Sequence, residues 1–328
     1  MKDYKLNHFN PIGKGSRKNK NTKPQIKGFG YQVLGFGAGG GAAPVMMHYQ
    51  VVGGGAGGGN SQGGGGGAGG YRISYDSPLA QPAGALEMAP GGYSITVGAG
   101  GGRNAQGGNS IFNPGGSEGT DMITGSGGGA GGGAAPVPSS PERTGNSTGS
   151  PGGCGGGHSI YAYPHPGVPN GVAAGNSGGY SPPEGQPGGA MNNRGSAGGG
   201  AGQAGSVGIT PDSGAVTGGN GVASSITGAS VTRGGGGGGG RGSPNPSGGT
   251  GGGGGGTSPG SAGYGGGGGG GNDVTGTAGT GGSGIVIVRV PSAAALVVSP
   301  GTNSVATGVG PDNDVVATFT VSGTLTIN

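Results

Sequence analysis

Short apolar segments alternate along this chain with long runs of glycine. Residues 31–36, 46–52 and 92–98 have the composition or the two-residue alternation of β-strands. Residues 285–290 are apolar at every position except Arg289, which predicts a central strand buried on both faces. No segment has the three- to four-residue apolar period of a helix, and abundant glycine disfavours helices. The pattern therefore predicts a mostly β and irregular fold with almost no α-helix.

The C-terminal residues 291–328 differ from the rest in composition. Residues 295–299, 315–320 and 324–327 are predicted strands, separated by turns at Pro300-Gly301 and Gly310-Pro311-Asp312. An apolar strand at the end of a chain leaves an edge that invites pairing unless it is covered. We expect this segment to pair with N-terminal strands of the same or a neighbouring subunit.

Glycine is by far the most abundant residue, with 102 of 328 positions, and it occurs in runs such as residues 234–240, 251–256 and 265–271. A glycine run can adopt an extended helix with three residues per turn and no internal hydrogen bonds, so its backbone groups must bond to neighbouring segments. A seven-residue run of this kind spans about 22 Å. The runs predict packed polyglycine helices between the strands. The alternative is a disordered low-complexity tract, which such a composition often indicates.

Few side chains are available for a conventional apolar core or for chemistry. Only 8% of the residues are charged and 5% are aromatic, so we expect an interior built mostly from backbone. The single cysteine, Cys154, excludes an intramolecular disulfide framework. His158 lies four residues further on, but no second pair of ligands has metal-site spacing. We expect neither a metal nor a cofactor.

Charge is concentrated in residues 1–27. This segment carries a net charge of +7, and the rest of the chain carries −3. Tyr4, Phe9 and Ile12 add apolar groups, and we interpret the segment as an arm that docks onto another protein. A nucleic-acid-binding arm and a tethered tail are the alternatives. Its basic residues are Lys2, Lys5, Lys14, Arg17, Lys18, Lys20, Lys23 and Lys27.

No segment has the pattern of a secretory signal or of a transmembrane helix. The N-terminus is basic but lacks an apolar stretch, and the longest apolar segments have the length of strands. We therefore expect synthesis in a cytoplasm and no membrane insertion.

The order of these segments resembles the glycine-rich domain of bacteriophage tail fibres and other virion proteins. The resemblance covers about residues 28–290 and depends on four features: the strand and glycine run at 48–59, the similar unit at 93–102, the Gly-Gly-Asn-Ser-Ile-Phe turn at 107–112, and Gly-Ile-Val-Ile-Val-Arg at 284–289. It implies a β and polyglycine-helix body that displays loops on a fibre exposed on the particle. It also implies contacts with other virion proteins and, as is usual for fibres, a trimer. The lysine-rich arm and the lack of a long shaft depart from this pattern.

The resemblance and the charge pattern together divide the chain into three parts. Residues 1–27 are the docking arm, 28–290 the glycine-rich domain and 291–328 a C-terminal β segment. The preferred hypothesis is a tail-fibre or tail-tip component that binds a receptor on the host surface. The alternatives are a capsid, neck or tail structural protein without receptor binding, and a cellular glycine-rich protein.

The strongest candidate for binding is the loop between residues 158 and 194. Tyrosine offers contact area at a low cost in conformational entropy, and sugar rings stack on aromatic faces. The alternative is that these side chains fix the loop against the glycine-rich domain. A second, weaker candidate loop spans residues 71–90. The candidate receptor-binding residues are Tyr161, Tyr163, His165 and Tyr180.

Catalysis has no local signature in the sequence. Gly-x-Gly-x-x-Gly patterns are inevitable at this glycine content, and none opens a predicted helix as a dinucleotide site requires. The acidic residues are scattered, and no glycine run precedes the Lys-Ser/Thr pair of a phosphate loop. We expect no enzymatic activity.

Overall fold

The structure is a computed structural model that describes residues 43–76, 79, 84–133, 148–160, 171–190, 194–208, 216–240, 246–272 and 276–328. The chain divides into the units Met1–Gly41 and Ala42–Asn328, and all described residues belong to the second. The basic arm and the predicted strand at residues 31–36 lie outside the described residues.

Most strands belong to two antiparallel sheets. The first has the order β11-β12-β9-β1-β2, and β3 pairs with the beginning of β1. The second has the order β10-β13-β4-β5-β6, and β7 forms a separate pair with β8. The strands of the first sheet are β1 (Val45–Val52), β2 (Tyr71–Ile73), β3 (Leu86–Met88), β9 (Ile285–Val290), β11 (Ser304–Val309) and β12 (Asp314–Phe319). The others are β4 (Gly91–Thr96), β5 (Ser110–Phe112), β6 (Ile123–Gly125), β7 (Val222–Ser224), β8 (Val231–Arg233), β10 (Leu296–Ser299) and β13 (Gly323–Ile327).

Strand β9 is the centre of the first sheet, as its sequence predicts. It pairs with β1 on one side and β12 on the other, and all six of its residues are buried. Val286 and Val288 belong to one apolar cluster, whereas Ile285 and Ile287 belong to another that includes Tyr71. The two-residue alternation of a strand thus supplies side chains to both faces of the sheet.

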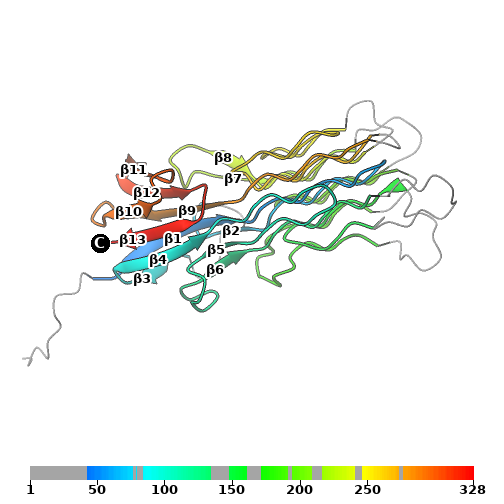
Figure 1. Ribbon diagram of the computed structural model, residues 1–328. Coiled ribbons are helices and arrows are strands. Elements are labelled where there is room, and N and C mark those ends of the chain that lie inside the picture. The colour runs from blue at the N-terminus through cyan, green and yellow to red at the C-terminus, as the bar shows by residue number, and fades with distance from the viewer. Residues whose placement is uncertain are drawn as a thin grey trace, which may run out of the picture. The chain divides into compact units, whose positions relative to one another are not determined.

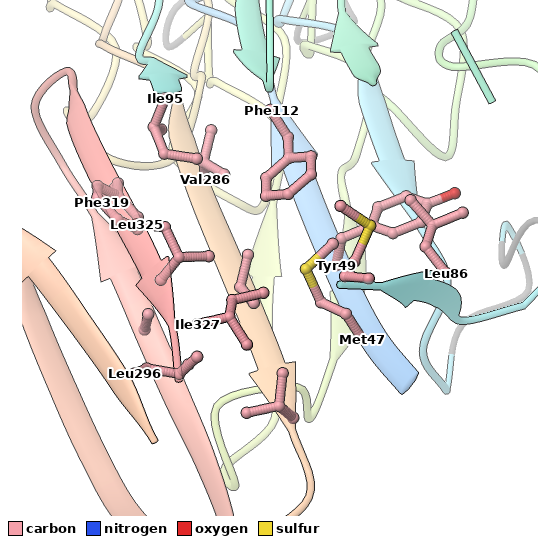
Figure 2. Packing of buried hydrophobic residues seen from close by; sticks show 14 of the residues in the cluster. Met47, Tyr49, Leu86, Ile95, Phe112, Val286, Leu296, Phe319, Leu325 and Ile327 are labelled. Carbon is pink, nitrogen blue, oxygen red and sulfur yellow. The ribbon is translucent and has the colours of Figure 1, made fainter. Parts of the chain in front are cut away.

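The main apolar core lies between the two sheets (Figure 2). Met47 and Tyr49 of β1 meet Phe112 of β5, and Leu325 and Ile327 of β13 pack nearby. A core of this kind was not expected from the low aromatic and charged content. An interior made mostly of backbone is therefore a property of the glycine segments and not of the sheets.

The C-terminal segment contributes strands to both sheets of its own chain. β12 pairs with β9, and β13 pairs with β4 and β10. The predicted strands at 295–299, 315–320 and 324–327 correspond to β10, β12 and β13. β11 was not predicted, and it forms the outer edge of the first sheet.

The glycine segments extend from the strands and are joined to one another by backbone hydrogen bonds (Figure 1). The run that follows β1 donates to three different neighbours with a period of three residues. Gly53, Ala56 and Gly59 donate to Gly70, Gly67 and Gly64; Gly54 and Gly57 donate to Gly108 and Ala105; Gly55 and Gly58 donate to Gly282 and Gly279.

The same run accepts hydrogen bonds from three further segments. These donors are Gly101 and Asn104, Gly128 and Gly131, and Gly268 and Gly271. Residues 53–59 are thus surrounded by six bonded neighbours. The predicted polyglycine helices stay a prediction, and three residues per turn is the period that they require.

Close approach of these backbones requires glycine. A Cβ atom placed on Gly57 would lie 2.6 Å from the carbonyl carbon of Gly102, and one placed on Gly58 would lie 2.6 Å from that of Gly269. Ala56, just before them in the sequence, is fully buried and fits. The described residues form no α-helix, which confirms the predicted fold class.

Candidate binding site

The candidate site lies where the glycine segments reverse direction, away from the sheets. Residues 53–59 leave β1, the turn at residues 60–63 reverses the chain, and residues 64–70 return to β2. Three other parts of the chain bond to this turn. Ile160 donates to the Gln62 carbonyl at 3.3 Å, Gly240 donates to that of Gly63 at 2.8 Å, and Ser61 donates to that of Gly276 at 3.0 Å.

Each of these three contacts involves a residue at the end of a segment that connects two glycine runs. Ile160 directly precedes residues 161–170, Gly240 precedes 241–245, and Gly276 follows 273–275, and all three of these segments lie outside the described residues. Their described ends are therefore gathered around one turn. The sequence alone could not reveal this, because a glycine run carries no side chains that specify its neighbours.

His158 connects several segments at this end. Its Nδ1 accepts a hydrogen bond from the Gly149 amide at 3.2 Å, and its own amide donates to Ser196 Oγ at 2.7 Å. The Ser196 hydroxyl donates in turn to the Gly189 carbonyl at 2.8 Å. His158 is 4% exposed, and burial lowers the pKa of its imidazole although a backbone contact with Gly171 opposes this. Because Nδ1 accepts, the neutral imidazole is the form that holds this end together.

Of the four predicted receptor-binding residues, the structure describes Tyr180 alone. Tyr161, Tyr163 and His165 lie outside the described residues, but Ile160, just before them, is at the turn of residues 60–63. Tyr180 lies elsewhere, next to the sheets.

Tyr180 packs against β2. The guanidinium carbon of Arg72 is 3.6 Å from the centre of the Tyr180 ring, and Arg72 Nη1 is 3.3 Å from Glu118 Oε1. Burial is the main cause that raises the pKa of the Tyr180 hydroxyl. Tyr180 is thus engaged in an internal cation–π contact, as expected if such residues fix the loop to the body.

Glu184 is a buried residue that the sequence did not single out. Its carboxylate accepts hydrogen bonds from the Ser126 amide at 2.9 Å and from the Gly178 amide at 3.0 Å. The Asn176 side chain accepts from the amides of Tyr180 and Glu184. These contacts fix residues 176–184 beside Ser126, the first residue of the 126–133 segment. Their role is structural.

The second candidate loop, residues 71–90, is partly sheet. Residues Tyr71–Ile73 form β2 and Leu86–Met88 form β3. Tyr75 contacts the His48 ring edge-on at 5.1 Å, and Asp76 bonds to Ser224 and Ser225 near β7. Within the described part of this segment, these side chains support the fold and do not form a separate binding loop.

The described part of the chain offers little for metal chemistry. None of its histidine, cysteine, aspartate and glutamate side chains form a group of three that could hold a metal ion. Cys154 is fully buried, and burial raises the pKa of its thiol. The described residues also contain no helix that is long and apolar enough to cross a membrane.

A family model for a glycine-rich domain matches residues 43–291. The chain belongs to this glycine-rich domain family. The glycine-rich domain includes β1 to β9 and all described glycine segments, and it ends just after β9. Strands β10 to β13 follow it, although they pair with its strands. No curated protein and no solved structure matches the chain.

Proposed function

We propose that the protein is a bacteriophage virion component, a tail-fibre or tail-tip protein that binds the host-cell surface with segments displayed by its glycine-rich domain. The observation that carries the proposal is the gathering of Ile160, Gly240 and Gly276 around the turn at residues 60–63. Binding residues are often placed on loops that a rigid scaffold positions. Here the scaffold consists of hydrogen-bonded glycine segments anchored in two sheets.

The residues that follow Ile160 in the sequence suit a receptor contact. Tyr161, Tyr163 and His165 supply aromatic faces within five residues. Such rings bind sugars or protein surfaces with few rotatable bonds to immobilise. Tyr180, the fourth candidate, has an internal partner in Arg72, so we assign it to the support of the fold.

The remaining parts of the proposal concern assembly. The basic residues of the arm from Lys2 to Lys27 dock the protein onto fibre, tail or capsid proteins. The protein is exposed on the particle as a homo-oligomer, with a trimer as the expectation for a fibre. A structural role in the capsid, neck or tail without receptor binding is the alternative that the experiment must separate.

Adsorption to candidate host cells tests the proposal. The purified full-length protein is compared with a triple variant, Tyr161→Ala, Tyr163→Ala and His165→Ala, and with the matched control Tyr180→Ala. We expect the triple variant to lose adsorption and Tyr180→Ala to retain it at temperatures where it is folded. Removal of residues 1–27 should leave adsorption intact, and periodate oxidation of the cell surface should abolish it if the receptor is a glycan. Equal adsorption by the wild type and the triple variant, or no adsorption by either, would reject the receptor-binding role of these residues.

A further inference from the structure

A second candidate site is a pocket of about 280 Å³ at the opposite end of β1. Met46 and His48 near the start of β1 line it, together with the end of β9 and the turn between β11 and β12. Val52, at the other end of β1, leads into the glycine segments. The pocket is therefore remote from the turn at residues 60–63. It lies within the described unit and uses none of the residues of the proposed receptor contact.

The charge of Arg289, which lines the pocket, already has partners within the protein. The side chain is 2% exposed, and Arg289 Nε donates to Asp314 Oδ2 at 2.8 Å. Its two terminal nitrogens donate to the carbonyls of Ile226 and Val309, both at 3.3 Å. The guanidinium also lies over the Tyr75 ring at 4.6 Å. Arg289 is thus neutralised and held in place by the protein itself.

His48 presents a hydrogen-bond acceptor. Its Nδ1 is 3.1 Å from the Ser74 carbonyl oxygen and 3.2 Å from Ser74 Oγ; because the carbonyl oxygen can only accept, the tautomer with the proton on Nδ1 satisfies both contacts. Nε2 is then the unprotonated nitrogen. The edge-on contact with Tyr75 fixes the orientation of the ring. Nε2 is the polar atom that His48 has available for a ligand.

Asp312 adds an unneutralised carboxylate. It is exposed, and within the described part of the chain it has no ion-pair or hydrogen-bond partner. Asp314 also lines the pocket, with one carboxylate oxygen bonded to Arg289. Two carboxylates and one guanidinium leave the lining with a net negative charge when His48 is neutral. The remaining polar groups are acceptors, and Met46 and Pro291 supply apolar walls.

From this lining we infer that the pocket binds the side chain of a lysine from a partner protein. A lysine combines an apolar stem of four carbons with a compact ammonium group that only donates hydrogen bonds. The stem lies along Met46 and Pro291, and the ammonium reaches the Asp312 carboxylate and His48 Nε2. The net negative charge of the lining repels anionic ligands such as phosphates or acidic sugars. The pocket marks a contact with a neighbouring protein at the sheet end of the molecule.

Methyl NMR on the full-length protein tests this inference. The protein is labelled with ¹³C at the methionine methyl groups, and the Met46 signal is followed while Nα-acetyl-L-lysine N-methylamide is added. The matched probe is the norleucine analogue, which keeps the stem and lacks the ammonium. We expect a saturable shift of the Met46 signal with the lysine probe and none with the norleucine probe.

Two variants distinguish binding of the lysine probe in the pocket from general attraction of the probe to acidic residues. Asp312→Asn should weaken binding of the lysine probe by up to about five-fold, the upper end of the range for a solvent-exposed ion pair. Glu87→Gln, which removes an exposed acid on β3 that does not line the pocket, should leave the affinity unchanged. The unperturbed signals of the other methionines report that each variant is folded. Equal shifts with both probes, no shift with either, or equal effects of the two variants would overturn the inference.

Discussion

Replacing Gly58 with alanine should destabilise the glycine segments, because its neighbours leave no room for a methyl group. The added Cβ would lie 2.6 Å from the carbonyl carbon of Gly269 and 2.9 Å from the Gly270 nitrogen. Real Cβ atoms essentially never come within 3.0 Å of such atoms. Both are backbone atoms, so no flexible side chain can turn away to relieve the contact.

The loss in the free energy of unfolding follows from the hydrogen bonds that the displaced segment would break. An ordinary carbon–carbon contact of about 3.5 Å requires residues 265–271 to move by about 1 Å. The bonds from Gly268 to Ala56, at 2.8 Å, and from Gly270 to Gly238, at 2.9 Å, cannot both survive such a shift. Each buried donor that loses its partner costs about 1–3 kcal/mol, and the restricted unfolded chain of the alanine variant returns about 0.4–1 kcal/mol. If both donors lose their partners, we expect a net loss of about 1–5 kcal/mol in the free energy of unfolding.

Urea unfolding followed by tyrosine fluorescence measures this loss. The control is Gly102→Ala, at an exposed position where an added Cβ meets no atom within 4 Å. The control should lie within about 1 kcal/mol of the wild type or be slightly more stable. If the two variants were equally stable, the backbones would not be packed as closely as the argument requires.

Two further predictions concern a buried charge and a buried imidazole. Arg289→Met should lower the free energy of unfolding by about 3–5 kcal/mol, because Asp314 keeps its charge without a partner; a loss below about 1 kcal/mol in urea unfolding would contradict this. Burial lowers the pKa of His158 in the folded state, so only the unfolded chain takes up this proton just below pH 6.5. Its stabilising effect is complete above the unfolded pKa of about 6.5 and is lost as the pH falls toward the lowered folded value. His158→Asn keeps an acceptor for the Gly149 amide but cannot titrate, so thermal unfolding between pH 7 and pH 5 should be less pH-dependent than in the wild type.

The longer strands were predictable from the sequence, whereas their partners were not. β1, β4 and β9 have the alternation or the apolar run of strands over six or more residues. β2, β6 and β7 contain only three residues each, too few for a periodic pattern. β11 is exposed along most of its length, so its sequence lacks the apolar face that marks a strand.

At the candidate sites, too, the sequence indicates the type of residue but not the residues that it contacts. The sequence of β9 singles out Arg289 as the one charged residue of a buried strand, but Asp314 and the carbonyls that receive its hydrogen bonds come from other elements. Tyr180 was recognised as an aromatic loop residue, yet only the structure reveals Arg72 beneath it. The sequence shows which of these side chains are charged or aromatic. It does not show their partners, because the glycine runs that connect the elements have no side chains to specify their neighbours.

The three-residue period of the hydrogen bonds restricts how the glycine segments can change in length. In the run of residues 53–59, each successive amide faces a different one of three neighbours. Inserting or deleting one residue would turn every later amide toward the wrong neighbour, whereas a change of three residues would restore the pairing and lengthen or shorten the segment by one period of the hydrogen bonds. Length variation within this domain should therefore occur in steps of three in its interior and in any number at the connections between segments.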